Sequence, residues 1–122
     1  MANPFVHVEL QTSDVAKARE FYGKLFAWKF EEMAMPEGYD YTMIKVGEGT
    51  GGGMMKSMAL EGLPPHWLAY VSVDDVAAST RKAKQLGAKI LMDVTKVGDL
   101  GSMSVFTDPT GAVLALWQVH KQ

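Results

Sequence analysis

His7 and Glu9 alternate with Val6, Val8 and Leu10 in the segment FVHVEL, residues 5–10. A β-strand sends successive side chains to opposite faces, so this segment predicts one apolar face and one face that carries an imidazole and a carboxylate. Gln11 continues the polar face. Such a pair could ligate a metal, transfer a proton, anchor a ligand or simply form a buried structural hydrogen bond. The residues alone leave all four roles open.

The segments around this strand predict an α+β protein. Residues 5–11 and 66–73 have the pattern of strands, and residues 12–26 and 74–87 have the pattern of amphipathic helices. We expect Thr12 or Ser13 to cap the first helix and Asp74 to cap the second. Strands are expected after the first helix at 28–33, 39–46 and 51–57, and after the second helix at 88–94, 102–108 and 112–119.

The second half of the chain repeats the first with an offset of 61 residues. The offset places Asp14 on Asp75 and Leu25 on Leu86, and it also superposes the strands that precede the two helices. This periodicity predicts two βαβββ modules, residues 1–60 and 61–122, within a single domain of residues 1–122. We expect their sheets to enclose a cup, a concave site of the kind that binds small molecules.

The composition excludes several classes of partner and chemistry. The 122 residues carry a net charge of −2, with both signs scattered along the chain, so nucleic acid and anionic membranes are not expected partners. The chain has no cysteine, which excludes disulfides, thiolate metal sites and a cysteine nucleophile. The N-terminal sequence has no signal-peptide pattern, and no apolar run reaches the ~20 residues of a membrane span. We therefore expect a cytoplasmic protein.

Two motifs give the chain a family resemblance. The helix Asp14–Tyr22 ends in Phe21-Tyr22 and leads into LFAW, and residues 108–111 form an Asp-Pro-x-Gly turn. With the paired βαβββ pattern, these motifs resemble the vicinal-oxygen-chelate superfamily of glyoxalase I, bleomycin-resistance proteins and extradiol dioxygenases. The sequence has Ala27 where the small glyoxalase-like proteins have glycine in LFGW. The resemblance covers nearly the whole chain and implies a cup-shaped fold, a small-molecule ligand and a homodimer.

The resemblance also implies four metal-ligand positions, one on the first and one on the last strand of each half. The residues at these positions are His7, Leu68, Ala115 and either Gly53 or Met54. A protein usually supplies three or four ligands to a divalent metal, so His7 alone is too few, and we expect no metal cofactor. If a metal is present, the expected ligands are His7 and possibly Glu9 and His66.

We therefore expect a protein that binds a small, partly apolar molecule, with His7 and Glu9 as the candidate acid/base pair. The predicted lining of the cup is His7, Glu9, Gln11, Met54, Leu68, Tyr70, Ser72, Ala115 and Trp117. A metal-dependent lyase or dioxygenase with a non-standard ligand set, and a non-catalytic partner-binding module, are the alternative hypotheses. Whether the protein is an enzyme is left open by the sequence, because a fold does not fix a function.

Overall fold

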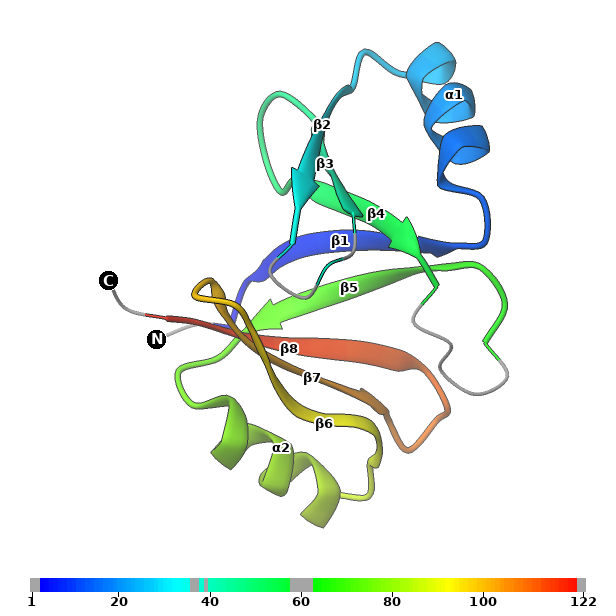
Figure 1. The fold of residues 1–122 in the computed structure, drawn as a ribbon. Coiled ribbons are helices and arrows are strands. Elements are labelled where there is room, and N and C mark those ends of the chain that lie inside the picture. Colours follow the sequence, from blue (N-terminus) through cyan, green and yellow to red (C-terminus); the bar gives the residue numbers. More distant parts are fainter. Residues whose placement is uncertain (1–2, 36–37, 39, 58–62, 121–122) are drawn as a thin grey trace. The chain divides into compact units, whose positions relative to one another are not determined.

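The computed structural model describes residues 3–35, 38, 40–57 and 63–120 (Figure 1). The chain divides into two compact units, one formed by His7–Leu68 and the other by Met1–Val6 with Ala69–Gln122. Each unit contains one helix and four strands. The chain therefore has the predicted α+β architecture of two βαβββ modules.

The first unit has the strand order β2-β3-β4-β1. Its elements are β1 (Phe5–Thr12, in this unit from His7 on), α1 (Val15–Leu25), β2 (Lys29–Ala34), β3 (Asp40–Lys45) and β4 (Gly52–Lys56). β1 and β4 run parallel, whereas β3 is antiparallel to both of its neighbours. The parallel pair follows from the order of the elements, because the chain must cross over before it can return beside β1.

One face of this sheet carries the apolar core of the first unit. Leu10, Ile44 and Met54 are buried there, and Val15, Ala18, Tyr22, Trp28, Phe30 and Val46 pack against them. Leu10 thus faces α1, as the alternation of the first strand predicts. Burying one such side chain contributes about 1.5–3 kcal/mol, so this cluster accounts for the attachment of the helix to the sheet.

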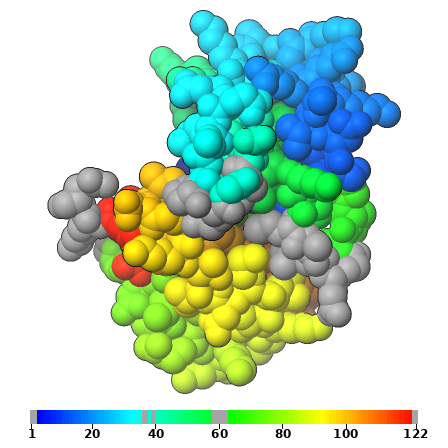
Figure 2. Space-filling view, viewed as in Figure 1, coloured from blue at the N-terminus to red at the C-terminus, as the bar shows by residue number. Residues whose placement is uncertain are grey.

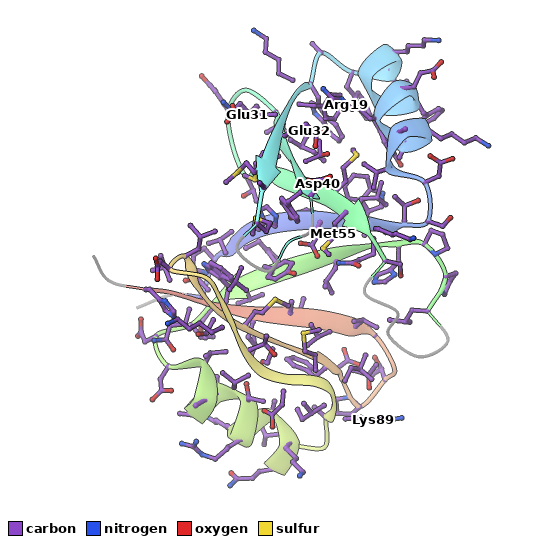
Figure 3. The ribbon with its side chains drawn as sticks, viewed as in Figure 1. Arg19, Glu31, Glu32, Asp40, Met55 and Lys89 are labelled. Carbon is purple, nitrogen blue, oxygen red and sulfur yellow. The ribbon has the colours of Figure 1, made fainter. Side chains whose placement is uncertain are left out.

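The edge strand of the first unit, β2, carries charged side chains. Figure 2 shows β2, in cyan, at the surface of the first unit, and Figure 3 labels its two carboxylates. Glu32 lies 2.6 Å from Arg19 of α1, and Glu31 lies 2.6 Å from Lys45 of β3. Exposed pairs of this kind contribute little to stability, because solvent screens the charges and ordering both side chains costs entropy.

The second unit has the strand order β5-β8-β7-β6. Its elements are β5 (His66–Ser72, in this unit from Ala69 on), α2 (Val76–Gln85), β6 (Lys89–Val97), β7 (Gly101–Thr107) and β8 (Val113–Val119). β5 and β8 are parallel, which repeats the pairing of β1 with β4. Thr80 of α2 bonds Val76 O and lies 2.8 Å from the hydroxyl of buried Ser104 on β7, so this helix is held partly by polar contacts.

The repeat extends to the start of each helix. Both β5 and α2 begin 61 residues after β1 and α1. The predicted caps are wrong: Asp14 and Asp75 are the N-caps, and their carboxylates each accept a hydrogen bond at 3.0 Å, from the N–H of Lys17 and of Ala78. A carboxylate at the N-cap position reaches the N–H of the third helical residue. Thr12, Ser13 and Asp74 lie one or two residues before the N-cap, too far from that N–H to bond it.

Candidate functional site

The polar face of β1 holds a chain of hydrogen bonds among residues of the first unit. Nε2 of His7 lies 2.6 Å from the hydroxyl oxygen of Tyr41, and that hydroxyl donates to Oε2 of Glu9 at 2.7 Å. Nε2 of Gln11 donates to Oε1 of the same carboxylate. Glu9 and Gln11 are buried, with 4% and 1% of their surfaces exposed. The sequence analysis named His7, Glu9 and Gln11 of this series but not Tyr41.

Proton positions follow from this arrangement. With Glu9 ionised, the one proton of the tyrosine hydroxyl is donated to the carboxylate, and Nε2 of His7 then carries the proton that it shares with the tyrosine oxygen. The His7 and Tyr41 rings are also stacked, with centroids 6.1 Å apart and planes inclined by 27°. A carboxylate, a phenol and an imidazole in series can pass a proton from one end to the other, which is what an acid/base site requires.

The absence of a side chain at Gly53 leaves room for the Tyr41 ring. A Cβ atom on Gly53 would lie 2.2–2.3 Å from three atoms of the Tyr41 side chain, including its hydroxyl oxygen. The phenol therefore lies directly over the bare backbone of β4. The sequence signal for this contact is the GGG run at residues 51–53, but only the strand register shows which ring uses the space.

The register also decides between Gly53 and Met54. Glu9 pairs with Gly53 and Leu10 with Met54, so Gly53 shares the face of His7. Met54 is fully buried in the core beside Leu10, on the helix side of the sheet. The placement of Met54 on the face of His7 is thus wrong. Met55, labelled in Figure 3, pairs with Gln11 and is the methionine on that face.

The residues at the four implied ligand positions do not fit a divalent metal. Gly53 has no side chain and is covered by Tyr41, while Leu68 and Ala115 are fully buried apolar residues. Within residues 3–35, 38, 40–57 and 63–120, no group of three or more His, Cys, Asp or Glu side chains is placed to hold a metal ion. The alternative set of His7, Glu9 and His66 is therefore not assembled.

The second unit carries the remaining predicted residues on one face. Tyr70 pairs with Ala115 and Ser72 with Trp117, so these four share a face of β5 and β8. The rings of Tyr70 and Trp117 meet edge to face at 6.4 Å, and the Tyr70 hydroxyl donates to Sδ of Met103 at 3.8 Å. Hence Tyr70, Met103 and Ala115 repeat the arrangement of Glu9, Tyr41 and Gly53, without the carboxylate.

The burial of His7 makes the stability of the folded protein depend on pH. Burial lowers the pKa of His7 below its ordinary value of 6.5. The unfolded chain then binds a proton near pH 6.5 while the folded chain resists it, so the free energy of unfolding falls as the pH drops below that value. We expect the denaturation midpoint to decrease between pH 7.5 and pH 5.5 and the His7→Gln variant to show a smaller decrease. An equal decrease in both proteins would contradict this assignment.

These features define a class: a paired βαβββ protein with a buried polar network on the first strand. The sequence model of the Glyoxalase/Bleomycin resistance protein/Dioxygenase superfamily matches residues 5–116, and the chain belongs to this family. A Mycobacterium bovis protein named "Putative glyoxylase CFP32" is 40% identical over 117 residues, which is 93% of this chain and 45% of that protein.

Two further comparisons extend the relationship. The anthracycline biosynthesis protein DnrV of Streptomyces peucetius is 28% identical over 127 residues, 90% of this chain and 45% of that protein. The chain thus spans about half the length of the curated relatives it matches. Methylmalonyl-CoA epimerase from Mycobacterium tuberculosis has the same fold, with a TM-score of 0.69 at 17% identity over 96% of this chain and 88% of that one. In the part of the chain described above, neither helix is long and apolar enough to cross a membrane.

Proposed function

We propose that the protein binds a small, partly apolar carbonyl compound on the face of β1 that carries His7, Glu9 and Gln11. The observation that supports this most directly is the hydrogen-bonded series from His7 through Tyr41 to the buried Glu9 carboxylate. Burying a carboxylate is costly unless its oxygens are paired, and here both oxygens accept hydrogen bonds. A fold alone would be served by an apolar residue at this position, so the network favours a binding or proton-transfer role.

The proposed chemistry is metal-independent. Glu9 would take a proton from a carbon next to the bound carbonyl group and become neutral, and the negative charge would move to the enolate oxygen of the ligand. The names of the relatives are compatible with a small carbonyl or polyketide-like ligand, because one is called a glyoxylase and another an anthracycline biosynthesis protein. These names describe the relatives, and the ligand of this chain is part of the proposal.

The Tyr41→Phe variant tests the proposal. It removes the hydroxyl but keeps the ring over Gly53. We expect 1-phenyl-1,2-propanedione to raise the melting temperature of the original protein, because a ligand that binds only the folded state stabilises it. The shift should be at least halved in Tyr41→Phe and retained in Trp67→Ala, which alters the helix side of the unit. An unchanged shift in Tyr41→Phe would contradict a role for the network in binding.

Metal analysis tests the alternative of a metal-dependent lyase or dioxygenase. We expect purified protein to contain much less than one equivalent of nickel, zinc or iron. A stoichiometric metal that is lost in His7→Ala would overturn the metal-independent proposal.

The homodimer implied by the resemblance is also a proposal, and light scattering should give twice the chain mass of 13.4 kDa if it is correct.

A further inference from the structure

Three methionines share the face of the first unit's sheet that carries the polar network. They are Met33 on β2, Met43 on β3 and Met55 on β4. Each is directly opposite a member of the network or the glycine beneath the Tyr41 ring: Met33 pairs with Tyr41, Met43 with Gly53 and Met55 with Gln11. Paired residues on neighbouring strands point to the same face, so three thioethers border the network.

These methionines are not ordinary core residues of the first unit. Met33, Met43 and Met55 are half-buried, so part of each side chain is open to solvent on this face. Met54, in contrast, is fully buried on the helix side of the same sheet. A methionine side chain is unbranched and polarisable, adapts to the shape of a ligand and makes favourable contacts with aromatic rings.

The fold does not require methionine at these positions. In the second unit the equivalent positions pair with Met103, Ala115 and Ser72, and they hold Thr95, Val105 and Trp117. Threonine, valine and tryptophan are residues that strands ordinarily favour. The same βαβββ module therefore forms without methionine here. Three methionines on the face that carries the polar network, and none at the equivalent positions of the other unit, indicate a ligand contact rather than a packing requirement.

We propose that the carbonyl compound bound on this face carries an aromatic ring beside its carbonyl group, and that Met33, Met43 and Met55 hold this ring. The inference rests on the proposed function, because Glu9 and Tyr41 fix the place of the carbonyl group. The methionines lie on the strands that follow β1 across the sheet, in the order β4, β3 and β2. Neighbouring strands are about 4.8 Å apart, so the ring extends from the carbonyl group over β4 and β3.

A saturated ring of the same size separates sulfur contacts from apolar burial. Both kinds of ring remove apolar surface from water, but only the aromatic ring gains the sulfur–arene contact. Leucine conserves the volume of methionine and has no sulfur, so exchange of the two residues is well tolerated. Replacing the methionines by leucine should therefore remove the preference for an aromatic ring and leave the apolar surface in place.

Isothermal titration with 1-phenyl-1,2-propanedione and 1-cyclohexyl-1,2-propanedione tests this inference. The measured quantity is the ratio of the two affinities. We expect the ratio to fall about twofold to tenfold, in disfavour of the phenyl compound, when Met33→Leu, Met43→Leu and Met55→Leu are combined. Met54→Leu is the matched control, because it makes the same exchange on the opposite face of the sheet, and it should keep the ratio of the original protein. Circular dichroism should show that each variant is folded.

The methyl signals of isotope-labelled methionines locate the ring by nuclear magnetic resonance. An aromatic ring shifts the signals of methyl groups that lie close to it. We expect the phenyl compound to shift the methyl signals of Met33, Met43 and Met55 and to leave that of Met54 in place. The cyclohexyl compound, which has no ring current, should cause much smaller shifts. Single exchanges of each methionine for leucine assign the signals.

Three results would overturn the inference: an unchanged ratio in the combined variant, an equal fall in Met54→Leu, or ring-dependent shifts confined to other methionines. The proposed function would survive each of these results if both compounds bind and Tyr41→Phe weakens both. If neither compound binds to the original protein, the proposed function and this inference fail together. Failure of the inference alone is thus distinguishable from failure of the proposed function.

Discussion

The Gly52→Ala variant is expected to lose at least about 3 kcal/mol of folding stability, at or beyond the upper end of typical overpacking costs. A Cβ atom at this position would lie 2.0 Å from the carbonyl oxygen of Val8. Gly52 and Val8 are directly paired in the parallel β1–β4 ladder, so the clash is with backbone that cannot rotate away. Relief requires β1 and β4 to separate, which would break their hydrogen bonds and expose the core around Leu10 and Met54.

Chemical denaturation should show this loss as a lower midpoint. Gly23→Ala is the control, because Gly23 lies within α1 and its added Cβ would meet only the edge of the Phe30 ring at 3.3 Å. Alanine is favoured over glycine in a helix by up to about 1 kcal/mol, which offsets the small shift that the Phe30 ring must make, so this variant should stay within about 1 kcal/mol of the original protein. A Gly52→Ala protein of unchanged stability would show that the strands are not paired as described.

The Gly53→Ala variant is expected to damage the polar network more than the fold. Its Cβ would collide with the Tyr41 ring rather than with backbone. The ring can move, but its hydroxyl is engaged by both His7 and Glu9, so movement breaks two hydrogen bonds. We expect a stability loss of about 1–3 kcal/mol and at least a tenfold weaker binding of 1-phenyl-1,2-propanedione.

A double-mutant cycle isolates this contact. Tyr41→Ala removes the ring, so the added methyl group of Gly53→Ala then has room. The stability losses of the two single variants should therefore exceed, in sum, the loss of the double variant by about 1 kcal/mol or more, as expected for residues in direct contact. Strict additivity would mean that Gly53 and Tyr41 do not touch. Isothermal titration of the probe into the same four proteins would measure the effect on binding.

The sequence by itself determined the elements of the fold and which polar residues share one face of β1. Alternation placed Leu10 toward the helix and His7, Glu9 and Gln11 together on the other face, because side-chain direction in a strand has a period of two. The 61-residue repeat predicted the two modules, since matching helices and strands are local patterns. The family followed from the same local signals and is confirmed over residues 5–116.

Only the tertiary structure decided which residues from distant strands meet. The choice of Gly53 over Met54 depends on the register of β1 with β4, and a slip of one residue reverses every side chain. Tyr41 bonds Glu9 although the two residues are 32 positions apart in the sequence. The contact depends on the space at Gly53, and a glycine in the sequence does not show which ring will occupy that space. Strand pattern is a local property, whereas register and hydrogen-bond partnership arise when strands pair.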